Sequence, residues 1–172
     1  MNKNTKVVMV TIAVLVFAVA ALAWLNQGNV AERRAMQESG TFLISIDGNK
    51  YAVTMDDLEE IGPSVIDANY KTNLMPAVQK KYTGVPLRSI FDHFEVDCYE
   101  AKSIVFSAGD GYASVAPLAD ALNGDSCYIV YKEADKLLGT RESGGDGPYM
   151  AIFAKDRFSQ RWCKYLLEIT VR

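Results

Sequence analysis

The sequence predicts an α+β domain with a mixed, mainly antiparallel sheet, placed behind one apolar N-terminal helix. Runs of alternating apolar and polar residues, typical of strands, recur along residues 41–172. Short helical patterns lie between them without a regular strand–helix alternation, which argues against a parallel α/β sheet. This span is long enough for one hydrophobic core and too short to divide further.

The N-terminal residues 1–25 are expected to be a membrane anchor or a signal segment. Residues 7–25, VVMVTIAVLVFAVAALAWL, carry no charge and are long enough to cross a bilayer as a helix. The length of the run and Trp24 near its end favour an anchor, which predicts a single-pass protein of the cell membrane with its domain outside the cytoplasm. The ALA sequence at residues 21–23 leaves cleavage open, and a cleaved protein would be secreted.

Residues 26–40, NQGNVAERRAMQESG, are polar with scattered small apolar residues and are expected to form a stalk that is partly helical. Arg33 and Arg34 weaken the charge asymmetry across the apolar run. The opposite orientation in the membrane therefore also stays open.

The first elements of the domain follow from local patterns. Residues 42–53 alternate on both sides of Asp47-Gly48, which predicts a β-hairpin. Thr54 can accept a hydrogen bond from the amide of Asp57, so a capped helix should begin there and end at Gly62-Pro63. A strand over SVIDANYKT and a helix over VPLRSIFDHF are predicted next, the helix because its apolar residues have helical spacing.

The later apolar runs predict further strands, and PLADALNG between two of them predicts a helix of one or two turns. The strands are SIVFSA (103–108), YASVA (112–116), CYIVYKE (127–133), PYMAIFA (148–154) and YLLEITVR (165–172). Strands 103–108 and 112–116 flank the sequence GDGY. This sequence is either a plain turn or a turn at the rim of a binding site.

Composition excludes several functions. A formal charge of −3 with interspersed basic residues gives no footprint for nucleic acid. One histidine and three widely spaced cysteines do not form a zinc site. His93, Asp110 and Ser143 have the residue types of a serine protease triad, but a glycine-rich connection between strands is the better interpretation of Ser143. Outside the cytoplasm two cysteines can pair, and the alternative is that all three are small buried hydrophobic residues.

Five segments in register resemble the molybdopterin-binding domain of the sulfite oxidase family, over essentially all of residues 41–172. They are YTGVPLRSIF (82–91), VFSAGDGYASVAPLADAL (105–122), YIVYKEADKLL (128–138), GP (147–148) and RWCKYLLEITV (161–171). The resemblance implies the sulfite oxidase fold, a compact α+β domain with a mixed sheet. In that fold, loops at one end hold a pterin whose dithiolene carries molybdenum.

Two departures from the family pattern bear on function. Catalytic relatives supply a cysteine thiolate to the metal from the segment before the GVPL helix, and here residues 65–87 contain no cysteine. The family's arginine shortly after GP is also missing, with Tyr149 and Met150 in its place. The resemblance therefore implies a pterin or molybdopterin as cofactor, without molybdenum.

Five residues are the candidate cofactor-binding residues that the resemblance implies: Asp110, Tyr112, Arg161, Trp162 and Lys164. A carboxylate can accept paired N–H donors from a pterin ring, an aromatic side chain can stack on it, and two cations can contact an anionic or hydroxylated tail. The structural alternatives are a turn aspartate, a strand tyrosine, a core tryptophan and solvated charges. Arg141 and Arg157 are secondary candidates.

Three functions are compatible with these residues. The first is a non-catalytic pterin-binding or sensing module that signals to a membrane or extracytoplasmic protein partner whether its pocket is occupied. The second is an active molybdenum oxidoreductase with unusual metal ligation, and the third is a protein-interaction domain without a ligand. The missing cysteine, together with the absence of haem-attachment or iron–sulfur spacings in the sequence, favours the first.

Overall fold

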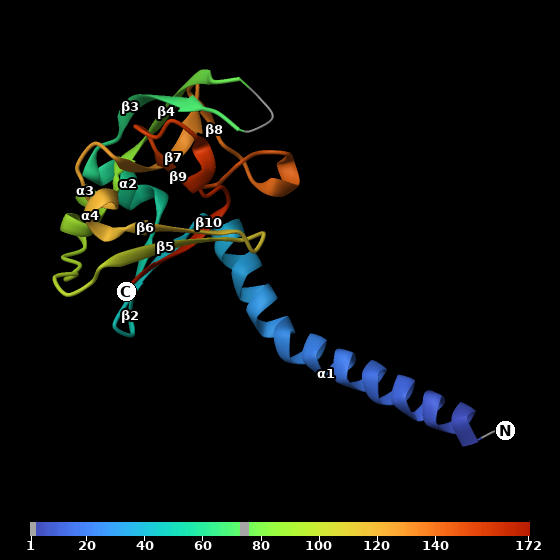
Figure 1. Ribbon diagram of the computed structural model, residues 1–172. Coiled ribbons are helices and arrows are strands. Elements are labelled where there is room, and N and C mark those ends of the chain that lie inside the picture. The colour runs from blue at the N-terminus through green and yellow to red at the C-terminus, as the bar shows by residue number, and fades with distance from the viewer. Residues whose placement is uncertain (1–2, 73–75) are drawn as a thin grey trace. The chain divides into compact units, whose positions relative to one another are not determined.

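The computed structural model describes residues 3–72 and 76–172 (Figure 1). The chain divides into two units, Met1–Ala35 and Met36–Arg172. The α+β class is confirmed, because the second unit combines two sheets with a few short helices.

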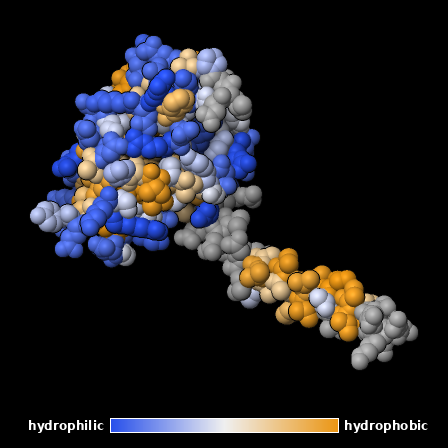
Figure 2. Space-filling model, viewed as in Figure 1, coloured by the Kyte–Doolittle hydropathy of each residue, from blue (hydrophilic) through white to orange (hydrophobic). Residues whose placement is uncertain are grey.

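The apolar run and the expected stalk belong to one helix, α1 (Lys3–Ser39). The stalk was expected to be only partly helical, but its alanine, glutamate, arginine and glutamine residues are strong helix formers that continue the apolar helix. Val7–Trp24 is apolar and long enough to cross a membrane, a property that anchors share with signal sequences. Figure 2 shows the apolar surface of this segment and a largely hydrophilic surface on the visible face of the second unit.

The first sheet has five strands in the order β2-β1-β10-β5-β6. Its pairs are antiparallel except β1 with β10, which are parallel, so the sheet is mixed, as predicted. The strands are β1 (Phe42–Ile46), β2 (Asn49–Val53), β5 (Ser103–Ala108), β6 (Ala113–Pro117) and β10 (Leu166–Val171).

The second sheet is antiparallel, in the order β3-β4-β7-β8, and β9 pairs with residues 127–130 of β7. Its strands are β3 (Ser64–Tyr70), β4 (Val78–Pro86), β7 (Cys127–Glu133), β8 (Lys136–Leu137) and β9 (Met150–Phe153). The sequence did not predict β4 or β8. Val85 and Pro86, expected to begin a helix, instead pair with Ile129 and Tyr128 of β7.

Short helices connect the strands. Thr54 caps α2 (Met55–Ile61) through the predicted capping box with Asp57. The other helical elements are α3 (Leu87–His93), α4 (Leu118–Ala121) and the 3₁₀ turns η1 (Arg141–Ser143) and η2 (Ser159–Arg161).

The hydrophobic core lies between the two sheets. Alternate residues of β1 and β5 are buried, as their sequence alternation predicts, whereas β9 and the first five residues of β7 are buried without alternation. Phe106 of β5 meets Phe153 of β9 edge to face, with ring centroids 5.8 Å apart. The strands supply this core, so the loops that connect their ends are available to carry a binding site.

Candidate functional site

Three segments that are distant in the sequence meet at one pocket of about 310 Å³, which we call the tyrosine pocket. They are the end of β3, the β5–β6 turn and residues 159–165. The residues that line the pocket are Tyr70, Thr72, Asp110, Tyr112, Ser159, Gln160, Trp162, Lys164 and Tyr165. Four of the five candidate cofactor-binding residues are among them.

Asp110 is both a turn residue and a rim residue. Its Oδ1 accepts a hydrogen bond from the backbone N–H of Tyr112 at 3.0 Å, and Gly111 has the positive φ of +91° that completes the turn. The N–H of Gly109 donates to the carbonyl of Tyr165 at 2.8 Å, which ties the turn to the opposite wall of the pocket. The carboxylate itself is exposed, so it keeps acceptor positions for a ligand.

Tyr112 precedes β6 and is held by its hydroxyl, which donates to the carbonyl of Gln160 at 2.5 Å. Its side chain is 43% exposed, although it lines the pocket. Burial of the hydroxyl raises its pKa, so the group remains a neutral donor. The ring is therefore fixed at one end and open to solvent or ligand along its face.

Trp162 is mainly a core residue. It is only 5% exposed, and its indole N–H donates to the carbonyl of Phe153 at 3.3 Å. Its ring contacts Tyr70 and Tyr82, with centroid distances of 5.7 and 5.8 Å. Trp162 thus supports the floor of the pocket by holding Tyr70 in place.

Lys164 lines the pocket as one half of an ion pair. Its Nζ lies 2.9 Å from Oδ2 of Asp146 and 5.2 Å from the ring centroid of Tyr70. Burial acts to lower the pKa of Lys164, but the hydrogen bond and charge of Asp146 outweigh it, so the pKa is raised. The ammonium group stays charged, and its charge is already balanced.

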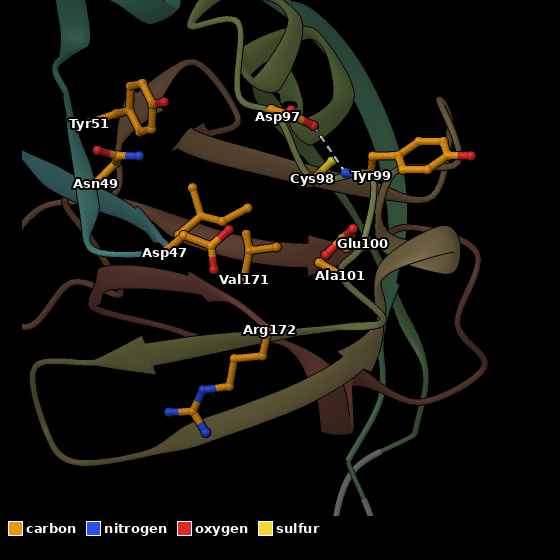
Figure 3. Close-up of a pocket in the computed structure, with 11 residues that line it drawn as sticks. Asp47, Asn49, Tyr51, Asp97, Cys98, Tyr99, Glu100, Ala101, Val171 and Arg172 are labelled. Atoms are coloured by element: carbon orange, nitrogen blue, oxygen red, sulfur yellow. Dashed lines mark hydrogen bonds between the residues drawn. The ribbon is translucent and has the colours of Figure 1, made fainter.

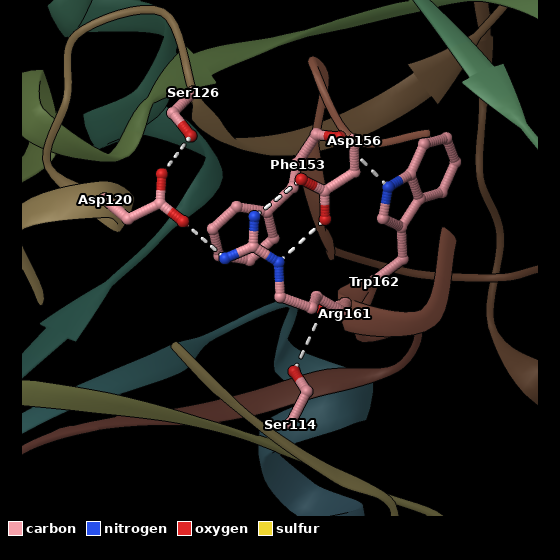
Figure 4. A network of polar contacts seen from close by, with 7 residues as sticks. All are labelled: Ser114, Asp120, Ser126, Phe153, Asp156, Arg161 and Trp162. Atoms are coloured by element: carbon pink, nitrogen blue, oxygen red, sulfur yellow. Dashed lines mark hydrogen bonds and ion pairs between the residues drawn. The ribbon is translucent and has the colours of Figure 1, made fainter. Parts of the chain in front are cut away.

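Arg161 does not line the tyrosine pocket, although it is adjacent to Trp162 in sequence. Its guanidinium group lies between Asp156, which it contacts through two nitrogens, and Asp120 (Figure 4). The same group lies over the ring of Phe153, 4.0 Å from its centroid. These contacts raise the pKa of Arg161, chiefly through the hydrogen bonds of Asp156, and they make the residue a structural tie between loops.

The departures from the family pattern concern Tyr149 and the cysteines. Tyr149, where the family has arginine nearby, is fully buried and its hydroxyl donates to the carbonyl of Gly40 at 2.6 Å. The three cysteines are unpaired. Cys127 and Cys163 are buried hydrophobic residues, and Cys98 is half-buried. Burial raises the pKa of Cys163 to about 12, so its thiol remains protonated at neutral pH.

Five further residues line the pocket that were not predicted from the sequence: Tyr70, Thr72, Ser159, Gln160 and Tyr165. Two signals could have found them. Tyr70 and Thr72 belong to the segment from which catalytic relatives supply a metal ligand, and the other three adjoin RWCK.

The secondary candidates lie outside the pocket lining. The guanidinium of Arg141 lies 5.8 Å from the ring centroid of Tyr165, and that of Arg157 lies 5.7 Å from the ring centroid of Phe158. Ser143 donates its hydroxyl to the carbonyl of Thr140, a local contact that fits its interpretation as part of a connection between strands.

A second, larger cavity of about 590 Å³ lies at the opposite end of the first sheet, where the β1–β2 turn, the end of β10 and residues 97–101 meet (Figure 3). Asp47, Asp97, Glu100 and Arg172 are its charged lining residues, and Asp97 accepts the N–H of Tyr99. It contains none of the candidate cofactor-binding residues. Within residues 3–72 and 76–172, no group of three or more histidine, cysteine or acidic side chains is arranged to hold a metal ion.

No family profile and no curated protein sequence matches this chain. Among solved structures, the sulfane dehydrogenase SoxCD from Paracoccus pantotrophus is similar, with a TM-score of 0.63 and 12% sequence identity. The similarity covers 79% of this chain and 38% of that one, so the chain spans less than two fifths of the chain that it matches.

At this level of identity the likeness establishes a shared fold. The chain therefore shares its α+β fold with part of the SoxCD chain, while its link to the sulfite oxidase family is a resemblance.

Proposed function

We propose that this protein is a membrane-anchored, extracytoplasmic and non-catalytic module that binds a pterin-type heterocycle in the tyrosine pocket and reports its occupancy to a protein partner. The observation that carries the proposal is the convergence of three distant segments on one aromatic pocket with an exposed carboxylate at its rim.

The chemistry of the lining suits a pterin ring. The amino and amide N–H groups on one edge of a pterin are paired donors, and a carboxylate such as that of Asp110 accepts both. Only one of its oxygens takes part in the turn, through the N–H of Tyr112. Tyr112, which is 43% exposed at the rim, offers a ring face on which a planar ring can stack, and Tyr70 and Tyr165 line the pocket beside it.

The same lining does not fit a complete molybdenum cofactor. No thiol lines the pocket among the residues that the structure describes, and residues 65–87 contain no cysteine in sequence. Cys127 and Cys163 are buried, with the pKa of each thiol raised by burial, so neither is a ready thiolate ligand. The residues thus support binding of the ring and not the metal chemistry of the catalytic relatives.

A contact inside the second unit supports a sensing role. The side-chain amide of Gln37, near the end of α1, lies against the backbone of Gly109, so closely that a methyl group on Gly109 would be 2.1 Å from its Nε2. Gly109 precedes Asp110 and is bonded to Tyr165 of the pocket wall. A ligand that reorders this turn would therefore change the surroundings of Gln37.

Titration of the full chain with pterin tests the proposal, with the protein in detergent micelles and binding followed by pterin fluorescence. Asp110→Asn removes the negative charge and replaces one acceptor oxygen by an NH₂ donor, while keeping the shape of the side chain. We expect it to weaken binding about tenfold or more, since a hydrogen bond to a charged group contributes roughly 1.5–3 kcal/mol. Asp47→Asn is the matched control, because Asp47 also precedes a glycine in an exposed turn but lies at the other end of the sheet.

Each result has a distinct meaning. Equal affinity of the Asp110→Asn variant and the wild type would remove Asp110 from the site. Stoichiometric molybdenum in protein from cells that make the cofactor, measured by mass spectrometry, would favour the oxidoreductase instead. Absence of pterin binding and of metal would leave a protein-interaction domain.

A further inference from the structure

We infer that the tyrosine pocket selects an unphosphorylated planar heterocycle and disfavours the phosphorylated form of the same ring. The inference rests on the proposed function, because it names the class of ligand that this pocket takes. Its basis is the ion pairing of Lys164, the cation in the lining, and of Arg161 and Lys80 nearby.

Lys164 is the one cation among the lining residues that the structure describes. Its Nζ is 2.9 Å from Asp146, and both side chains are about one third exposed. A phosphate approaching Lys164 would therefore also approach the carboxylate of Asp146. The ion pair presents no net positive charge to an incoming anion.

Two neighbouring cations, Arg161 and Lys80, are partnered in the same way. Arg161 faces two carboxylates, those of Asp120 and Asp156, and does not line the pocket. Lys80 lies 5.1 Å from the ring centroid of Tyr70 but is paired with Glu133, at 2.8 Å. Lys164, Arg161 and Lys80 are thus engaged by the protein's own acids, whereas Arg141, outside the pocket lining, lies over the ring of Tyr165.

Charge and size then point to the same ligand. Asp110 adds a carboxylate to a lining in which Lys164 is balanced by Asp146, so the formal charge of these three groups is negative. A dianionic phosphate would be repelled, whereas neutral N–H donors would be attracted. The volume of about 310 Å³ is at the small end of ligand sites, roughly 300–1,000 Å³, and suits fused rings with short substituents.

Two ligands with the same ring, 6-hydroxymethylpterin and its monophosphate ester, test the inference on the full chain in detergent at low salt. We expect the wild type to bind the unphosphorylated ligand about tenfold or more tightly than the ester, as one unfavourable charge contact would produce. Asp146→Asn frees Lys164 at constant shape and should reduce this preference about tenfold. Asp92→Asn, which frees Arg88 of α3 outside the pocket lining, is the matched control and should leave the preference unchanged.

The outcomes separate this inference from the proposed function. Equal or tighter binding of the ester by the wild type would overturn the inference and leave pterin binding intact. In that case Arg141→Ala, which removes the cation stacked on Tyr165, shows whether this arginine holds the phosphate. If neither ligand binds to any variant, the proposed function and the inference both fail. A thermal unfolding scan of each variant confirms that it is folded.

Discussion

Replacing Arg161 with alanine tests whether this residue serves the structure or the ligand. The sequence resemblance made Arg161 a candidate for binding an anionic tail, whereas the structure engages its guanidinium group with Asp156 and Asp120. We expect Arg161→Ala to destabilise the second unit and to leave the affinity for pterin within about twofold of the wild type, since a folded variant keeps the pocket lining.

The size of the effect follows from the contacts. Three charge-assisted hydrogen bonds are lost, and the acidic partners are 22% and 42% exposed in their side chains. Bonds of this kind contribute from roughly 0.5 kcal/mol when exposed to about 2 kcal/mol when buried, so about 1 kcal/mol each is appropriate here. The stacking of the guanidinium on Phe153 adds about 0.5–1 kcal/mol. The total loss is therefore about 3.5–4 kcal/mol.

Urea unfolding of the full chain in detergent, followed by near-ultraviolet circular dichroism, measures this loss, and pterin titration measures the affinity. Arg161→Lys is the informative control. It keeps the charge but cannot make the two-nitrogen contact with Asp156, so we expect it to recover about 1 kcal/mol. A variant that loses pterin binding while keeping its stability would refute the structural role of Arg161.

Two further predictions concern the core. Gly84→Ala should destabilise the fold by about 3 kcal/mol or more, measured by urea unfolding, because its methyl group would lie 2.3 Å from the carbonyl oxygen of Ile129. The control is Gly124→Ala, at an open position, which should change stability by less than about 1 kcal/mol. The pKa of Cys163 is raised on folding from 9.0 to about 12, so its contribution to stability is complete below pH 9 and is lost as the pH rises toward 12. Between pH 9 and 10 the free energy of unfolding of the wild type should decrease as the pH rises, and that of Cys163→Ala should decrease less steeply. Equal pH dependence of the two free energies would show that burial does not protect this thiol.

Local patterns predicted most of the elements correctly. The hairpin around Asp47-Gly48, the capping box at Thr54 and the strand over residues 127–133 were all found where they were expected. Each of these signals depends on residues that are close in sequence, such as a turn dipeptide, a cap three residues from its partner or a continuous apolar run.

Strand β4 was missed because its signal is not local. Its first half carries two lysines, Lys80 half-buried and Lys81 exposed. Its last residues, Val85 and Pro86, precede a helical pattern and were assigned to it. Pairing with β3 on one side and β7 on the other decides their conformation. Tertiary hydrogen bonding overrides local preference in such cases.

For the candidate site, the sequence alone determined which residue types and which segments to examine, because a turn such as GDGY and a charged aromatic segment such as RWCK can be recognised locally. Only the tertiary structure decided which way each side chain faces. It brought Asp110, Tyr112 and Lys164 to one pocket, placed most of Trp162 in the core, and turned Arg161 toward Asp120 and Asp156. The physical reason is that an ion pair or a packed ring depends on partners far away in the chain, and folding alone sets those distances.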